Sequence, residues 1–300
     1  MNLSRSDLTG LRVFEAVARN RGFAAAQVEL GLSQPAISNH ISALETRLGV
    51  RLCERGRSGF AVTEKGQFVL ESARRLFSAF DEFSGGMDDL RDRIVGQLRL
   101  GIVDALSTDP TMRLPQAIAR FKAVAPDVMI EVYEDTPHVL QERVRSGDLH
   151  FGMGSFTVKT NQLDYTPLYS ETHGVFCSDL HPLFDRAEDA GLTPEDIRDE
   201  AIVSRGYWRD EMLRETGFAN VAAMSFQIEP QLLLILSGQY IGFLPEHFAH
   251  DWVARGRMRQ LCQGELTYTC GFDLISLKSA PKTRMKLAFE AAMMAAHSEV

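Results

Sequence analysis

The sequence predicts two domains of different class: an all-α N-terminal domain with a short β wing, then a larger two-lobed α/β domain. Apolar residues recur at helical spacing through residues 7–48, and strands alternate with helices from Gln97 onward. Residues 1–65 hold nine Lys or Arg and six Asp or Glu, a net +3, whereas the remaining 23 and 34 give −11. A basic head on an acidic body suits a small nucleic-acid-contacting unit joined to a domain that avoids phosphate.

Three helices are expected in the N-terminal domain. Helical spacing predicts helices over residues 7–19 and 23–30, with Gly31 in the turn that follows. Ser33 can cap the third helix, which continues to about Leu48, because its hydroxyl accepts a free amide of the first turn. The apolar stripe of that helix is expected to pack inward through Ile37, Ile41, Leu44 and Leu48.

The opposite face of the third helix is polar, uncharged and short in side chain. A merely solvated face usually carries Glu and Lys, whereas amides and hydroxyls can hydrogen-bond the edges of bases. This pattern is typical of a winged helix-turn-helix module whose last helix enters the major groove, and an ordinary three-helix bundle is the alternative. The residues of this face are Pro35, Asn39, Ser42 and Thr46, flanked by Gln34 and Ser38.

A two-stranded wing is expected after the third helix. Arg51, Arg55 and Arg57 surround glycines and a serine, and the alternating stretch from Phe60 to Val62 follows. Arginines at a wing tip can neutralise phosphates or enter the minor groove, which positions a protein without reading sequence. A solvated charged loop is the alternative.

Residues 8–66 resemble the N-terminal domain of LysR-type transcriptional regulators. The most specific match is Ser33-Gln34-Pro35-Ala36-Ile37-Ser38, with Leu-Glu at 44–45 and Leu-Gly at 48–49. Residues 11–18, 22–26 and Thr63-Glu64-x-Gly66 match as well, whereas Cys53 stands where the family commonly has Phe. The resemblance implies that Gln34, Pro35, Ser38 and Asn39 face DNA and that Arg55 and Arg57 lie on the wing. With the helix residues added, the predicted DNA contacts are Ser33, Gln34, Pro35, Ser38, Asn39, Ser42, Arg55 and Arg57.

The family resemblance also implies what the protein does and with what it associates. It implies a sequence-specific, double-stranded-DNA-binding transcriptional regulator in the cytoplasm, acting as a homodimer or homotetramer. RNA polymerase is a further candidate partner. The expected organisation is a DNA-binding domain over residues 1–65, a linker helix over 66–94 and an effector-binding domain over 95–300.

A long helix, capped by Thr63, is expected to link the two domains. Heptad spacing of apolar residues predicts a coiled-coil seam that pairs two copies of the chain, and a helix packed on its own domain is the alternative. Gly85 and Gly86 interrupt this seam and mark an expected bend. The seam positions are Val69, Ala73, Leu76, Phe80, Phe83, Met87, Leu90 and Ile94.

The rest of the chain is expected to form two α/β lobes around a hinged cleft. Strands near 98–102, 128–132 and 149–153 alternate with helices over 111–124 and 136–146, which predicts a parallel sheet covered on both faces. A second such unit fits residues 170–260, a returning strand fits 265–278 and a closing helix fits 281–297. In that second unit, strands are expected near 174–177, 201–204, 223–227 and 240–244, and helices near 194–198, 208–216, 230–238 and 246–254. Lobe I then spans about 95–167 and 268–300, and lobe II about 168–267. In the family, this effector domain is similar to periplasmic binding proteins.

Ligand contacts are expected beyond the carboxyl ends of the strands, where helix N-termini present free amides. There Arg205 could hold a carboxylate, and Asp104 and Glu229 could hold an amine, although capping or solvation is commoner for any one acid. The hypothesis is therefore a small-molecule co-inducer, an amino acid or small carboxylate, with no other cofactor and no metal. The expected contacts are Asp104, Ser107, Thr108, Thr136, Ser155, Ser204, Arg205, Tyr207 and Glu229.

An enzyme and a solute-binding protein are the alternatives from other classes, and a thiol redox sensor is an alternative within the regulator class. No catalytic motif follows a strand, so an enzyme is not expected. A solute-binding protein would match the lobes but not the N-terminal module, and the start of the chain lacks an apolar signal segment. A thiol redox sensor would use Cys262 and Cys270, which could meet across a hairpin. No apolar run is long enough to span a bilayer.

Overall fold

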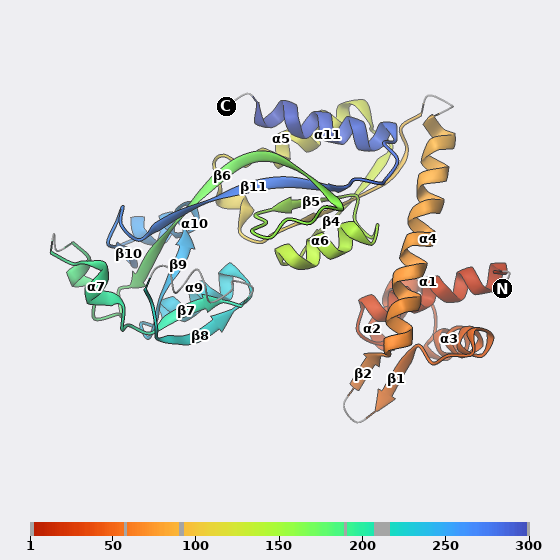
Figure 1. Cartoon of the computed structure of the whole chain (residues 1–300), viewed down its shortest axis with the longest axis horizontal. Coiled ribbons are helices and arrows are strands. Elements are labelled where there is room, and N and C mark those ends of the chain that lie inside the picture. Colours follow the sequence, from red (N-terminus) through yellow and green to blue (C-terminus); the bar gives the residue numbers. More distant parts are fainter. Residues whose placement is uncertain (1–2, 57–58, 90–92, 189–190, 207–216, 299–300) are drawn as a thin grey trace. The chain divides into compact units, whose positions relative to one another are not determined.

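A computed structural model describes residues 3–56, 59–89, 93–188, 191–206 and 217–298 of the chain (Figure 1). They fall into two compact units, the first comprising Met1–Met87 and the second most of the chain from Asp88 onward. The helix-turn-helix domain followed by an α/β domain confirms the predicted fold class. Among the described residues, no helix is both long and apolar enough to cross a membrane.

The first unit contains the three predicted helices and the wing. Ser4 caps the first helix in a reciprocal capping box with Asp7, and the Ser33 hydroxyl accepts a hydrogen bond from Ala36 N at 3.4 Å. Gly31 and Gly49 end the second and third helices at φ +62° and +69°, backbone conformations that favour glycine. The elements are α1 (Arg5–Arg19), α2 (Phe23–Leu30), α3 (Gln34–Leu48) and the antiparallel pair β1 (Cys53–Gly56) and β2 (Gly59–Val62).

A single long helix, α4 (Glu64–Asp89), follows the wing. The first half of α4 is not available to pair with a second copy of the chain, because Ala73 and its neighbours Leu70 and Phe77 are buried in the core of the first unit. Farther along α4, three seam residues are exposed: Phe80 by 46%, Phe83 by 70% and Met87 by 40%. The predicted coiled-coil repeat therefore divides into a half that packs on its own domain and a half that is uncovered in the single chain.

The expected length and bend of the linker helix also need correction. Gly85 and Gly86 continue in helical conformation, so no break in α4 marks them. The helix ends at Asp89, and Ile94 lies beyond it, packed against the core of the second unit. Leu90, another predicted seam position, lies outside the described residues.

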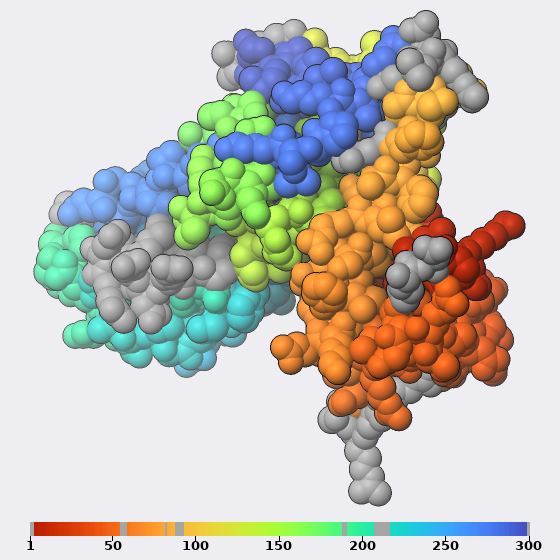
Figure 2. All heavy atoms as spheres, turned by 45° about the vertical axis from the view of Figure 1, so that its right-hand side comes forward, coloured from red at the N-terminus to blue at the C-terminus, as the bar shows by residue number. Residues whose placement is uncertain are grey.

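The second unit is built on one mixed nine-stranded sheet, with the order β4-β3-β5-β11-β6-β9-β7-β8 and β10 paired to β6. The three strands at each end are parallel to one another, as predicted. The two long strands between them, β6 and β11, run antiparallel to each other and lie side by side in both views (Figures 1 and 2). The sheet is therefore mixed rather than parallel. Strands β6 and β11 cross between the lobes, and their antiparallel pairing joins the two parallel ends into one sheet. The strands are β3 (Gly96–Ile102), β4 (Val128–Glu134), β5 (Phe151–Gly154), β6 (Leu163–Ser178), β7 (Ile202–Arg205), β8 (Val221–Ser225), β9 (Ile241–Pro245), β10 (Met258–Leu261) and β11 (Thr267–Leu277).

Helices cover both faces of this sheet. In lobe I, α5 and α11 pack on one face through the rings of Phe121 and Phe289, whose centroids are 5.5 Å apart, and α6 lies on the other (Figure 1). The expected helix over 208–216 lies outside the described residues. The helical elements are η1 (Leu106–Thr108), α5 (Leu114–Val124), α6 (Pro137–Arg145), η2 (Asp185–Glu188), α7 (Pro194–Ile197), α9 (Ile228–Leu236), α10 (Glu246–Ala254) and α11 (Arg284–His297).

Two strands differ most from the sequence-based expectation. Strand β6 begins at Leu163, whereas only residues near 174–177 were expected to be extended, and β10 was not expected. The first half of β6 contains a proline and several polar residues, so it lacks the apolar alternation that marks a strand. It is extended because β6 pairs with β11 at eleven register positions between Leu163 and Gly174, which satisfies its backbone.

Candidate DNA and effector sites

Helix α3 presents a polar face to solvent. Ile37, Ile41 and Leu44 are buried in the core of the first unit. Thr46 on the exposed face bonds its hydroxyl to the Ser42 carbonyl oxygen at 2.8 Å. The outer face therefore offers amide and hydroxyl groups and no carboxylate. Its exposed residues are Ser33, Gln34, Pro35, Asn39, Ser42 and Thr46, with Ser38 half-buried.

The wing is fixed to α3 by Glu45. Its Oε1 accepts hydrogen bonds from Leu52 N at 2.7 Å and from Cys53 N at 3.4 Å, just where β1 begins. Cys53 itself is buried in the core of the unit, and Phe60 on β2 packs edge-on against Phe23. The wing therefore keeps an aromatic contact with α2 despite the cysteine.

The predicted wing arginines are only partly described. Arg55 lies on β1 opposite Phe60, next to the terminal pair of Gly56 and Gly59, and its side chain is not described. Arg57 lies outside the described residues. Their assignment to DNA contact stays a prediction.

A tight corner joins the wing to α4. The Thr63 hydroxyl donates to the Arg51 carbonyl oxygen at 2.7 Å and accepts from Gly66 N at 2.9 Å, so Thr63 caps α4 as predicted. A Cβ atom on Gly66 would lie 1.9 Å from the Leu52 carbonyl oxygen. Only glycine fits there, and the corner fixes the direction in which the linker helix leaves the wing.

In the second unit, the strand ends of lobe I meet the start of α9 in lobe II. The carboxylate of Asp104, after β3, accepts a hydrogen bond from Ile228 N in the first turn of α9. Gln227, just before α9, donates through Nε2 to Glu134 at 3.1 Å. Asp104 thus caps a helix of the opposite lobe, and these contacts bridge the lobes at what we call the interlobe junction.

Negative charge is concentrated at this junction. Burial raises the pKa of Glu134, and the nearby carboxylates of Asp104, Asp135 and Glu229 raise it further. Asp135 forms an ion pair with Arg143, whose Nη1 lies 2.6 Å from Asp135 Oδ2. The arrangement can stabilise a positively charged group beside Glu134 and Glu229.

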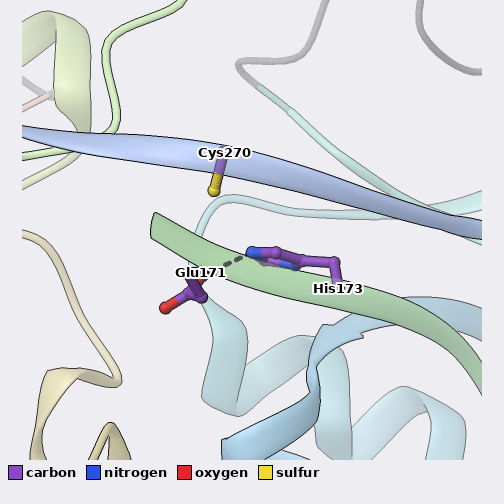
Figure 3. A group of neighbouring side chains, drawn as sticks. All are labelled: Glu171, His173 and Cys270. Carbon is purple, nitrogen blue, oxygen red and sulfur yellow. Dashed lines mark hydrogen bonds and ion pairs between the residues drawn. The ribbon is translucent and has the colours of Figure 1, made fainter. Parts of the chain in front are cut away.

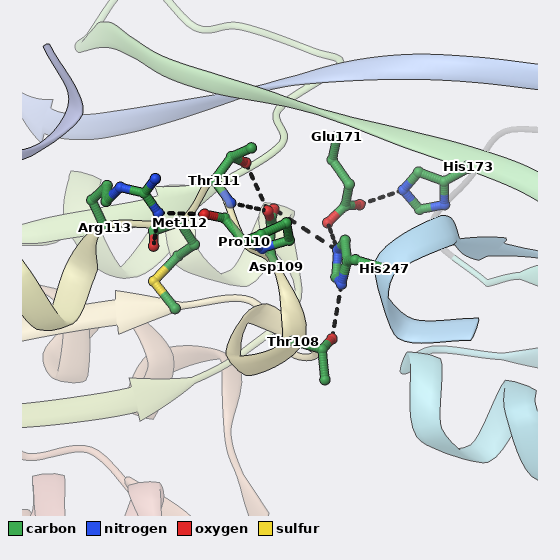
Figure 4. Close-up of polar contacts among 9 residues, drawn as sticks. All are labelled: Thr108, Asp109, Pro110, Thr111, Met112, Arg113, Glu171, His173 and His247. Carbon is green, nitrogen blue, oxygen red and sulfur yellow. Dashed lines mark hydrogen bonds and ion pairs between the residues drawn. The ribbon is translucent and has the colours of Figure 1, made fainter. Parts of the chain in front are cut away.

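A second polar group lies where β6 passes α10 (Figure 4). His247 Nδ1 lies 2.8 Å from Thr108 Oγ1, and its Nε2 lies 2.8 Å from Glu171 Oε2. His173 hydrogen-bonds the other oxygen of Glu171. Burial alone would raise the pKa of Glu171, but the bonds to the two histidines together lower it to about 2. Glu171 is therefore a carboxylate at neutral pH.

Arg205 and Cys270 complete the surroundings of this group, and Figure 3 shows Cys270 beside Glu171 and His173. Arg205 is buried at the carboxyl end of β7, and its charge helps to lower the pKa of His173, which burial brings to about 4. Burial and the nearby Glu171 raise the pKa of Cys270 to about 11, although the Ser155 hydroxyl bonds its thiol. A buried guanidinium thus lies close to the junction, as a carboxylate ligand would require.

The structure gathers some of the predicted effector residues and separates others. Asp104, Thr108 and Glu229 lie at or beside the junction, and Ser155 lies beside Cys270. The Thr136 hydroxyl bonds its neighbour His138 at 3.2 Å, Ser107 is exposed, and the buried Ser204 hydroxyl donates to the Arg205 carbonyl oxygen. Tyr207 lies outside the described residues.

Sequence reasoning missed Glu134, Glu171, His173 and His247. The pair Glu171 and His173 is spaced by two, which places both on one face of a strand, but that part of β6 was not expected to be extended. His247 lies 76 residues from Glu171, and no local pattern joins them.

The cysteines do not support thiol sensing. No disulfide joins any of the four within the described residues, and Cys177 and Cys262 are buried in one core cluster of lobe II. Burial raises the pKa of Cys177 to about 12 and also raises the pKa of Cys262. Thiolate, the reactive form, is therefore disfavoured at these positions.

Comparisons with known proteins agree along the whole chain. Residues 8–67 match the family described as bacterial regulatory helix-turn-helix protein, lysR family, and residues 91–294 match the LysR substrate binding domain. The HTH-type transcriptional activator BauR of Pseudomonas aeruginosa is 35% identical over 92% of this chain and 90% of its own length.

Solved structures share the fold at low sequence identity. A full-length OxyR variant from Pseudomonas aeruginosa has a TM-score of 0.61 at 21% identity, covering 98% of this chain and 95% of its own. CbnR, described as a LysR family transcriptional regulator, has a TM-score of 0.61 at 19% identity, covering 97% and 99%. A structure of full-length CbnR in complex with target DNA has a TM-score of 0.60 at 20% identity, covering 96% and 99%.

A winged helix-turn-helix unit joined to a two-lobed effector-binding domain defines the class of ligand-controlled transcriptional regulators. Within that class, the chain belongs to the LysR-type transcriptional regulator family, as its two domain matches and its similarity to BauR show.

Proposed function

We propose that this LysR-type regulator reads its operator through the exposed face of α3, and that a small amino-carboxylate bound between the lobes controls it. The observation that carries the DNA part is the composition of that face. It presents amides and hydroxyls that can bond base edges, on a helix whose other side is held in the core. Arg55 and Arg57 on the wing would bind phosphate or the minor groove.

Two substitutions separate these roles. Gln34→Ala should cost about 1–3 kcal/mol on the preferred operator and relax sequence preference at one base position. Arg55→Ala should weaken binding to all sequences alike and lower the slope of log affinity against log salt by about 1. Affinities for operator and scrambled DNA at several salt concentrations provide the measurement. Identical behaviour of the two variants would contradict the proposed division of labour.

For the effector, the support is opposite charge near one junction. Glu134 and Glu229 concentrate negative charge where the lobes meet, which suits an ammonium group. The buried Arg205 is suited to a carboxylate. A ligand that contacts both lobes would change the balance of the bridges Asp104–Ile228 and Gln227–Glu134. It would control DNA binding to the extent that it binds the two lobe arrangements with different affinity.

Calorimetric titration with amino acids and ω-amino acids tests the effector. We expect saturable binding that Arg205→Gln and Glu229→Gln each weaken by at least about tenfold, the loss of one charge-assisted bond. Asp251→Asn, which removes an exposed acid of α10 away from the junction, is the matched control. Binding only of uncharged or polycyclic aromatic compounds would overturn the amino-carboxylate proposal and leave the DNA proposal intact.

The assembly state belongs to the same proposal. Phe80, Phe83 and Met87 form an exposed apolar stripe at heptad spacing on the outer half of α4. A second copy of α4 would cover it, which gives a dimer that presents two α3 helices. Pairing of dimers to a tetramer and contact with RNA polymerase are extensions that the family resemblance suggests.

A further inference from the structure

We propose that Asp109, Glu171 and His247, in the polar group where β6 passes α10, form a binding site for a divalent transition-metal ion. One ligand atom from each residue lies within 4.8 Å of the others, so small side-chain adjustments would let one ion contact all three. Asp109 follows η1 in lobe I, Glu171 lies on the crossing strand β6, and His247 lies on α10 in lobe II (Figure 4).

The carboxylate of Asp109 is the observation that points to a cation. Its side chain is 3% exposed, and its Oδ1 accepts two hydrogen bonds from Thr111, each 2.7 Å long. The other oxygen, Oδ2, is buried, has no hydrogen-bond partner among the residues that the structure describes, and lies 3.8 Å from His247 Nε2. A buried carboxylate oxygen without a donor is costly, and a metal ion would satisfy it.

His247 is already oriented as a ligand. Thr108 Oγ1 holds its Nδ1 at 2.8 Å, which turns Nε2 toward both carboxylates. Metal-binding histidines commonly donate their other ring N–H to such an outer partner. A hydroxyl can donate or accept, so Thr108 serves the imidazole whether Nε2 carries a proton or a metal ion. The ion would take the place of a proton between two carboxylates.

A second group, Glu171, His173 and Cys270, overlaps this one (Figure 3). It is less suited to an ion, because His173 already bonds Glu171 Oε1 and the guanidinium of Arg205 lies near both His173 and Cys270. The assignment therefore rests on the oxygen of Glu171 that faces His247.

The donor set indicates the class of ion. One imidazole nitrogen with two carboxylates suits Zn²⁺, Mn²⁺ or Fe²⁺, whereas Ca²⁺ and Mg²⁺ take oxygen ligands almost alone. Three protein ligands leave at least one coordination position for water or a small ligand. Because the ligands come from both lobes, the ion would also join lobe I to lobe II.

The experiment is metal titration of the full chain, free of affinity tag and stripped with EDTA. Calorimetry with Zn²⁺ and with Mn²⁺, and metal analysis after gel filtration, should give about one ion per chain. Asp109→Asn and His247→Gln should each weaken binding at least about tenfold, and Thr108→Val about 10- to 100-fold. His250→Gln, an exposed histidine of the same helix, and Cys270→Ser should bind as the unchanged protein does.

The same samples also show whether each variant folds and whether a cation other than a metal ion occupies the site. The Asp109→Asn side chain keeps its shape without a buried charge, so its melting temperature in EDTA should match that of the unchanged protein. The proposal is wrong if the unchanged protein retains no ion, or if Asp109→Asn and His247→Gln bind normally. Loss of binding in Cys270→Ser alone would also overturn it. The proposal is also wrong if the protein binds no metal but ethylammonium, added in EDTA, raises its melting temperature only when Asp109 is present. An ammonium group would then be the occupant of the site. Failure here leaves the proposed DNA and effector roles untouched.

Discussion

At the scale of single residues, the second unit depends on buried side chains that must keep one charge state. His150 is buried and its Nδ1 accepts a hydrogen bond from Arg99 N at 3.0 Å, which only the unprotonated nitrogen can do. Burial, with the charges of Arg99 and Lys286, lowers the pKa of His150 from 6.5 to about 3. Glu171 must instead stay charged, because a carboxylate accepts the hydrogen bonds that link it to His173 and His247.

His150 makes the second unit sensitive to acid. Below its unfolded pKa of 6.5, the unfolded chain binds more protons than the folded one, so stability is lost as pH falls toward about 3. Its contribution to the slope is about 1.4 kcal/mol per pH unit. Urea unfolding followed by tryptophan fluorescence measures this, because both tryptophans come after residue 200 in the sequence and Trp252 lies on α10 of the second unit.

His150→Asn keeps an acceptor near the same place and should flatten the pH dependence between about pH 6.5 and 5. The exposed His138→Asn is the control and should leave the slope as it is. Equal slopes for all three proteins would show that His150 does not titrate on unfolding.

At the scale of elements, α4 performs different tasks along its length. Its start is fixed to the wing by Thr63 and Gly66, its first turns complete the core of the first unit, and its outer half carries the exposed stripe. A strict heptad was predicted over the whole helix because the spacing of apolar residues does not show what covers them. The cover can be the same domain or a second copy of the chain. Burial in the structure divides it near Phe77.

Two glycines of this helix should respond oppositely to alanine. Gly66→Ala places a Cβ atom 1.9 Å from the Leu52 carbonyl oxygen, so the wing or the helix must shift, at a cost of about 1–3 kcal/mol. Gly86→Ala meets nothing within 4 Å and should stabilise the helix by about 1 kcal/mol. Thermal unfolding followed by circular dichroism checks both, and loss of stability in both variants would mean that Gly86 serves as a hinge.

Much of the element order could be predicted from the sequence, and the failures have a common physical cause. The helices of the first unit follow from strong periodicity and from local caps at Ser33 and Thr63. The first half of strand β6 could not be foreseen, because its extended backbone depends on pairing with β11, far along the chain. For the same reason Glu171 and His247 were missed, whereas Asp104 and Arg205 could be placed from the ends of apolar strands.

At the scale of the whole molecule, the proposed DNA-reading helix, the proposed dimer-forming stripe and the pair of lobes proposed to bind the effector belong to one chain. Two copies paired through α4 would present two α3 helices to one duplex. Such dimers bind half-sites about one helical turn of DNA apart, or a multiple of it, so the preferred operator should have two-fold symmetry.

Selection of bound sequences from a random DNA library tests this central claim most directly, with the unchanged protein, Phe83→Ser and Phe68→Ser. Phe68 and Phe83 are about equally exposed on α4, at 69% and 70%, but only Phe83 lies on the stripe. The unchanged protein and Phe68→Ser should select an inverted repeat with half-sites about 10 base pairs apart or a multiple of that. Phe83→Ser should select isolated half-sites at weaker affinity. A motif without two-fold symmetry, or the same inverted repeat at undiminished affinity from Phe83→Ser, would contradict the account.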